Sequence, residues 1–202
     1  MTLHLPEKHS FSGLLGKKTL ITGTVRTGKT KLTVDLLEEA VGLGYSALVT
    51  VIDMAPESVT VGGKSIGGRL SEFTEACQEV RYLTPHRVET PRLTAKSAEE
   101  LLNLVRLNAG SIKPLLEEYI EEPSPILFVN DISIYLQSGS TEPVLEAMVL
   151  AETFIANGYY GEYFREDLET GVSGIEREMM DQLASHMDTV IRLSAEANEQ
   201  SS

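Results

Sequence analysis

Residues 23–30 of the chain are Gly23-Thr24-Val25-Arg26-Thr27-Gly28-Lys29-Thr30. Four residues separate the two glycines, and Lys and Thr follow the second one, as in a loop that wraps around phosphate groups. Such a loop points backbone N–H groups at the anion, while Lys29 reaches the terminal phosphates and Thr30 offers its hydroxyl to Mg²⁺. We therefore expect residues 23–30, with Lys31 directly after them, to bind a nucleotide.

Both flanks of this loop support that interpretation. Residues 18–22 predict a strand before it, and apolar residues at helical spacing predict a helix after it that ends near Gly44. The apolar run 47–52 then predicts a second, buried parallel strand that ends at Asp53. Because open parallel sheets bind ligands beyond the carboxyl ends of their strands, we expect Asp53 on the same rim as the loop.

A later apolar strand also ends in an acid. Residues 126–129 are Ile, Leu, Phe and Val, and Asn130 and Asp131 follow them, which is the pattern of a Walker B strand. Asp131 is expected to hold Mg²⁺, directly or through water, on the side opposite Thr30. Strands that alternate with helices predict an α/β fold, a three-layer sandwich with a mainly parallel central sheet.

The remaining segments carry weaker signals. The glycine-rich residues 61–69 predict an irregular loop, and apolar spacing over 70–80 predicts a helix before a short strand at 80–83. Capping boxes at 97–100 and 173–176 predict two helix starts, and Gly110 with Pro114 predicts a kink or a break in the first of these helices. Residues 142–152 predict a helix, 153–156 either its end or a strand, 158–171 an aromatic loop, and 189–193 a last strand.

Size and charge narrow the class of protein. The 202 residues fit one nucleotide-binding domain over 1–202, with an N-terminal extension at 1–17 and a frayed tail at 195–202. The net charge is −13, yet the chain through Lys31 carries +5, which leaves −18 for the remainder. An acidic remainder repels a nucleic-acid backbone and argues against that partner. One cysteine, Cys77, and no bilayer-length apolar run favour a cytoplasmic protein without disulfides and without a membrane segment.

The sequence does not single out a catalytic base. Ile132 follows Asp131, where a glutamate would be expected to orient the attacking water. Asp53 and Glu57 are therefore the candidates for the base. A solvated acid or a loop cap explains each of them equally well. Four further cations could contact phosphate or could simply be solvated: Arg26, Lys64, Arg69 and Arg165. The four histidines show no i, i+4 pairing, which argues against a zinc site.

The loop 23–30 together with the strand 126–131 resembles the P-loop NTPase superfamily, and the order of strands and helices is most similar to its RecA-like and KaiC-like ATPase branch. The resemblance implies a P-loop architecture, Lys29 and Thr30 as phosphate and Mg²⁺ ligands, and Asp131 as the Walker B acid. It also implies Asn157 as a polar sensor and assembly into a homo-oligomer. Residues 26–30 and 131–136 more faintly resemble adenosylcobinamide kinase/guanylyltransferases.

Three functions remain open at this point. The first is an Mg²⁺-dependent ATPase that is slow or needs a protein partner; GTP is less expected because no Asn-Lys-x-Asp guanine reader is present. The second is a small-molecule kinase or nucleotidyl transferase whose acceptor pocket involves residues 62–69 and 159–165. The third is a non-catalytic, nucleotide-gated module that binds another protein.

Overall fold

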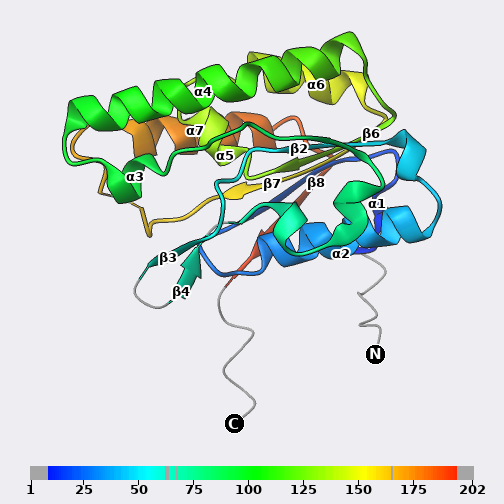
Figure 1. Ribbon diagram of the computed structural model, residues 1–202. Coiled ribbons are helices and arrows are strands. Elements are labelled where there is room, and N and C mark those ends of the chain that lie inside the picture. The colour runs from blue at the N-terminus through cyan, green and yellow to red at the C-terminus, as the bar shows by residue number, and fades with distance from the viewer. Residues whose placement is uncertain (1–8, 62–63, 67, 165, 195–202) are drawn as a thin grey trace.

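A six-stranded, all-parallel sheet forms the centre of the protein (Figure 1). The computed structural model describes residues 9–61, 64–66, 68–164 and 166–194. The strand order is β5-β2-β6-β7-β1-β8. Its strands are β1 (Lys18–Gly23), β2 (Val49–Asp53), β5 (Arg81–Leu83), β6 (Ile126–Asn130), β7 (Thr153–Tyr159) and β8 (Thr189–Leu193).

Helices cover both faces of this sheet (Figure 1). On one face lie α1 (Phe11–Leu14) and α2 (Lys29–Gly42). The other face carries α3 (Pro91–Thr94), α4 (Ala98–Glu121), α5 (Ser133–Leu136), α6 (Glu142–Leu150) and α7 (Val172–Ala184). The α/β fold with a parallel central sheet between two helical layers is therefore confirmed.

Two apolar cores hold the layers together, because the central strands are buried on both faces. Phe128 of β6 stacks on Phe11 of α1, with ring centroids 6.3 Å apart, on the side of α2. On the other side, Leu116 and Tyr119 of α4 are fully buried together with Phe154 of β7. Cys77 is 6% exposed within the first of these cores.

Helix α4 runs unbroken through Gly110 and Pro114, so the predicted break into two shorter helices is wrong. A proline ring in a helix clashes with the carbonyl four residues earlier. Here that carbonyl belongs to Gly110, which is exposed and has no side chain to restrain its backbone. Continuous burial of one helix face, including Ile112 and Leu116, offsets the hydrogen bond that Pro114 cannot make.

Three other local predictions are corrected. Within 61–69 the chain forms an antiparallel hairpin of β3 (Val59–Val61) and β4 (Lys64–Ile66), whereas Gly62, Gly63 and Gly67 lie outside the described residues. Residues 70–80 form two short 3₁₀ segments, η3 (Leu70–Glu72) and η4 (Glu75–Gln78), separated by the extended Thr74. Residues 47–48, predicted as the start of the second strand, belong instead to a further 3₁₀ segment, η2 (Ser46–Leu48), which precedes β2.

The predicted capping box at 173–176 is also wrong. Helix α7 begins at Val172, after Gly171. The φ of Gly171 is 77°, in the left-handed region that glycine adopts readily. Ser173 and Glu176 instead bond to other segments. The alternative for residues 153–156 is resolved in favour of a strand, because they begin β7. Residues 1–8 of the predicted N-terminal extension over 1–17, and the predicted tail 195–202, lie outside the described residues, whereas 9–17 contain the packed helix α1.

None of the helices within the described ranges is long and apolar enough to cross a bilayer.

Two leucines of α4 test whether packing on the sheet holds this helix. Leu116 is fully buried and Leu107 is 54% exposed. We expect Leu116→Ala to lower the free energy of unfolding by about 2–5 kcal/mol, because it leaves a cavity against the sheet. The matched change Leu107→Ala should stay within about 0.5 kcal/mol. Urea denaturation followed by circular dichroism measures both, and equal losses would contradict the packing described here.

Candidate functional site

The loop 23–30 joins β1 to α2 and has the tight backbone that its sequence predicts. Arg26 and Gly28 both adopt the left-handed conformation, with φ of 61° and 89°. The Lys29 ammonium group donates to the Thr24 carbonyl at 2.7 Å, and the Thr27 hydroxyl donates to the same oxygen at 3.0 Å. A Cβ on Gly23 would lie 2.5 Å from the Leu193 carbonyl oxygen, so only glycine fits there. Both ends of the loop are therefore held by close contacts.

A cavity of about 250 Å³ opens beside this loop, at the carboxyl ends of the strands. Its lining includes Lys29, Thr30 and Asp131, which are the three residues expected to bind phosphate and metal. The rest of its lining comes from loops, helices and strand ends around the same edge: Val25, Arg26, Gly28, Lys31, Ala55, Pro56, Gly68, Thr90, Pro91, Arg92, Leu93, Asn130, Ile134, Gln137, Asn157, Tyr159 and Phe164.

Asp131 is fixed by its neighbours on β7. Its φ is 54°, a left-handed conformation that aspartate tolerates better than most residues. The Asp131 N–H donates to Asn157 Oδ1 at 3.1 Å, and the Ser133 hydroxyl donates to Asp131 Oδ1 at 2.8 Å. That hydroxyl in turn accepts from the Tyr159 N–H at 3.1 Å. The carboxylate is thus held at the end of β6, facing the cavity that Lys29 also lines.

Burial and neighbouring charges shift the pKa values of Asp131 and Lys29 in opposite directions. Burial raises the pKa of the Asp131 carboxyl, and the hydrogen bond from Ser133 and the charges of Lys29 and Arg92 oppose that rise. Burial lowers the pKa of the Lys29 ammonium group, and the charge of Asp131 opposes it. Lys29 and Asp131 thus each favour the charged form of the other, as groups that bind phosphate and metal require.

The oxygen donors in the cavity suit Mg²⁺. Thr30 and Asp131 line the same cavity and supply a hydroxyl and a carboxylate, which are hard ligands. Within the described part of the chain, no group of three or more His, Cys, Asp or Glu side chains could hold a metal by itself. Mg²⁺ fits this sparse set because it is usually held by one or two protein oxygens together with substrate phosphates and waters.

A line of buried polar side chains, which we call the polar chain, crosses the sheet behind the cavity. Asn157 Nδ2 donates to the Thr33 hydroxyl and to Asn130 Oδ1, each at 2.8 Å. Asn130 Nδ2 donates to Asp53 Oδ1 at 2.8 Å, and the Tyr82 hydroxyl donates to Asp53 Oδ2 at 2.7 Å. The polar chain therefore connects α2 with β7, β6, β2 and β5.

The polar chain changes the interpretation of two predicted site residues. Asp53 is fully buried, and it also accepts from the N–H groups of Ala55 and Leu70, so its carboxylate accepts four hydrogen bonds. Neither Asp53 nor the exposed Glu57 belongs to the cavity lining. Asn157 lines the cavity, but both of its amide hydrogens are already donated, which favours a positioning role over that of a sensor.

The sequence did not predict the ion pair that closes the cavity on the side of α7. Arg92 of α3 donates to both oxygens of Glu176 at 3.0 and 2.8 Å, and the two side chains are 7% and 3% exposed. The Gln137 amide donates to Glu176 at 2.7 Å. Because 84 residues separate Arg92 from Glu176, no spacing rule could have paired them.

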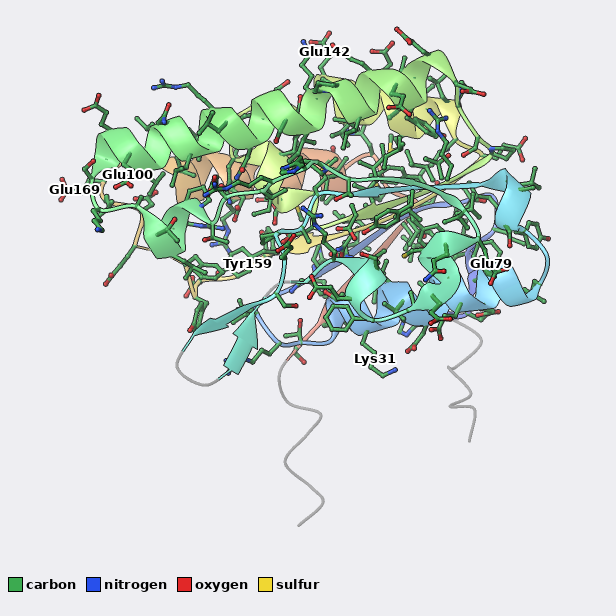
Figure 2. All side chains as sticks on the ribbon, viewed as in Figure 1. Lys31, Glu79, Glu100, Glu142, Tyr159 and Glu169 are labelled. Atoms are coloured by element: carbon green, nitrogen blue, oxygen red, sulfur yellow. The ribbon has the colours of Figure 1, made fainter. Side chains whose placement is uncertain are left out.

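The remaining predicted cations differ in position. Arg26 is exposed at the cavity. The Lys31 side chain points away from the sheet (Figure 2) and pairs with Asp35 at 2.9 Å. Arg69 lies away from the cavity and donates to the Pro85 carbonyl at 2.9 Å. Arg165 and the side chain of Lys64 lie outside the described residues.

Comparisons with known proteins do not identify a family. No protein-family model matches the sequence, and no curated protein matches it. Among solved structures that match, the crystal structure of Pif1 helicase from Candida albicans aligns with a TM-score of 0.40 and 16% identity. The alignment covers 95% of this chain and 40% of the helicase chain, so this chain spans less than half of the helicase's length. A likeness at this level establishes neither a family nor an activity.

Asn157 offers a direct test of the polar chain. We expect Asn157→Leu to lower the free energy of unfolding by about 3 kcal/mol, since it leaves Asn130 Oδ1 and the Asp131 N–H without their partners. The control Asn103→Leu changes an exposed asparagine on α4 and should stay within about 0.5 kcal/mol. Thermal unfolding measured by calorimetry compares the two. Similar midpoints would show that the polar chain does not stabilise the rim.

Proposed function

We propose that this protein binds Mg²⁺ and ATP and cleaves the terminal phosphoanhydride bond, slowly or when a partner completes the site. The observation that carries the proposal is the convergence of Lys29, Thr30 and Asp131 on one cavity at the carboxyl ends of parallel strands. Residues that lie about a hundred positions apart in the sequence thereby form a single anion and metal site.

Each of these residues has a separate part in binding. The loop N–H groups and the start of α2 favour negative charge, and Lys29 neutralises the terminal phosphates. Thr30 and Asp131 hold Mg²⁺, which when bound neutralises charge on the phosphate oxygens. The contacts from Asn157 and Ser133 fix Asp131, so the carboxylate needs little rearrangement to bind the ion.

Slow turnover is expected because the described lining of the cavity offers a single carboxylate. Asp131 is the only carboxylate among the described lining residues, and its proposed role is to hold the metal. A water molecule would therefore have no second carboxylate to orient it. A protein partner or a second copy of this chain could supply the missing group, as in sites that are completed in trans.

The choice of ATP over GTP rests on the sequence. The chain has no Asn-Lys-x-Asp segment, and no other guanine reader is evident in it. We therefore propose ATP as the preferred nucleotide. The non-catalytic alternative, in which the nucleotide only gates binding of another protein, differs in one measurable way, because bound ATP would then be recovered without hydrolysis.

Lys29 tests the anion site. We expect Lys29→Ala to weaken the affinity for ATP in the presence of Mg²⁺ by about 10- to 100-fold, because it removes a charge-assisted hydrogen bond to phosphate. The control Lys113→Ala removes an exposed lysine of α4, which pairs only with Glu117 at 3.4 Å in the described structure, and should leave the affinity unchanged. Titration calorimetry measures both variants.

The same titrations examine the metal site. Thr30→Val keeps the shape of the side chain but removes its hydroxyl, and it should abolish the gain in ATP affinity that Mg²⁺ gives over EDTA. Release of inorganic phosphate from ATP by the unaltered protein then measures turnover. Undiminished ATP binding by Lys29→Ala would refute the proposed role of the loop.

A further inference from the structure

Part of the cavity lining has no role in the proposed ATP and Mg²⁺ site. We call this part the distal chamber and define it by the side chains of Pro91, Leu93, Ile134, Gln137, Tyr159 and Phe164. These residues come from α3, α5, the segment after α5, the end of β7 and the loop after it. Tyr159 is the last residue of β7 and is buried. Most of the chamber surface is therefore apolar or aromatic.

Arg92 carries a charge at the edge of the distal chamber, but its ion pair with Glu176 has no net charge. The Arg92 guanidinium group is bonded through two nitrogens to Glu176, and it lies 5.3 Å from the centre of the Tyr159 ring and 4.8 Å from that of Phe164. An anionic ligand would have to separate this buried pair before it could use the arginine. The chamber therefore favours an uncharged ligand.

Gln137 supplies an unused hydrogen-bond acceptor. Its side chain is 2% exposed, and its Nε2 group donates to Glu176 Oε2 at 2.7 Å. If the Gln137 amide were flipped, its oxygen would face Glu176 Oε2 and the two oxygens would repel each other. The NH₂ group therefore faces Glu176, and the amide oxygen points the other way. Gln137 Oε1 is buried, and it has no hydrogen-bond partner among the residues that the structure describes. Such an orphaned acceptor is costly and favours a ligand that brings an O–H or N–H donor.

The distal chamber also adjoins the reacting end of the proposed nucleotide. It forms one cavity with Lys29 and Asp131, which act on the terminal phosphate and its metal in the proposed function. A molecule in the chamber would thus lie next to the phosphoryl group that is cleaved. It would also exclude water from that position.

We infer that the distal chamber binds a second substrate, a small uncharged molecule with an apolar or planar body and a hydroxyl group, which accepts the phosphoryl group from ATP. This inference rests on the proposed function. In the transfer, the acceptor oxygen forms a bond to the γ-phosphorus, and the bond from that phosphorus to the β,γ-bridging oxygen breaks. ADP leaves with the electron pair, and the hydroxyl proton is released to solvent. The products are ADP and a phosphate monoester.

Benzyl alcohol, toluene and benzoate provide three probes with the same ring. Binding to the full chain is measured by NMR titration with Mg²⁺ and a β,γ-imido analogue of ATP present. We expect benzyl alcohol to bind about 3- to 10-fold more tightly than toluene, since it donates one hydrogen bond to Gln137. Benzoate should bind most weakly of the three. Equal affinities for benzyl alcohol and toluene, or tightest binding of benzoate, would overturn the inference.

Two variants locate the binding site. Gln137→Met keeps the length of the side chain but removes the acceptor, and it should abolish the preference for benzyl alcohol over toluene. Leu93→Trp fills the chamber without touching the Arg92–Glu176 pair, and it should abolish binding of both probes. The control Leu107→Ala, on the outer side of α4, should bind them normally. Retained binding in Leu93→Trp, or displacement of benzyl alcohol by adenosine, would place the probes elsewhere or assign the chamber to the nucleobase.

The last measurement addresses phosphoryl transfer. With γ-labelled ATP and saturating benzyl alcohol, we expect label on benzyl alcohol together with a fall in phosphate release of at least 5-fold, since the ligand displaces water. Absence of label on benzyl alcohol would contradict the acceptor role even if phosphate release falls. Unchanged phosphate release would refute the acceptor role. Calorimetry with ATP and Mg²⁺ on the same sample tests the ATP site separately from the distal chamber. Absence of ATP binding contradicts the proposed function itself, whereas ATP binding without any probe binding contradicts only the distal chamber.

Discussion

The geometry of the site depends on the buried hydrogen bonds that cross the carboxyl ends of four neighbouring strands. Asn157 is the central link, because it bonds to Thr33 on the phosphate-loop helix, to Asn130 at the end of β6 and to the backbone of Asp131. Buried amides must find partners, so these contacts accept few alternative arrangements. They fix the separation between α2 and the end of β6, and therefore the separation between Thr30 and Asp131. The rim is positioned by polar contacts, while the layers beneath it are held by apolar packing.

Charges alternate in sign along the cavity. Lys29, Asp131 and Arg92 line the cavity, Glu176 of α7 lies behind Arg92, and the charge of a neighbouring cation acts on each carboxyl. Burial raises the pKa of both carboxyls, and the adjacent cations oppose this effect. A cavity with balanced charge can bind a metal–nucleotide complex at one end and an uncharged molecule at the other. The two ends differ in net charge. The Lys29 ammonium group is paired with a neutral backbone carbonyl and keeps its charge for a ligand, whereas the charge of the Arg92 guanidinium is balanced by the Glu176 carboxylate.

Much of this arrangement could be predicted because it is encoded locally. The loop 23–30, the buried strands and the acid at 131 each have a spacing that carries a physical meaning, and the parallel sheet follows from their order. The role of Asp53 could not be predicted, since a strand-ending acid looks the same whether it faces solvent or accepts four hydrogen bonds. The continuity of α4 and the Arg92–Glu176 pair depend on contacts with distant segments, which no local pattern contains. Whether Lys29, Thr30, Arg26 and the other loop residues bind a nucleotide stays a prediction.

The strand order has a consequence for the synthesis of this protein. Strand β1, which carries the phosphate loop, pairs only with β7 and β8 within the sheet, and these begin at Thr153 and Thr189. On the ribosome β1 is made well before β7 and β8, so it has no neighbour in the sheet until β7 has been made. Strands β2, β5 and β6 can meet one another much earlier, so the half of the sheet without the phosphate loop is able to assemble first. A nascent or prematurely terminated chain would thus expose an unpaired apolar strand, and such chains are candidates for chaperone binding and degradation.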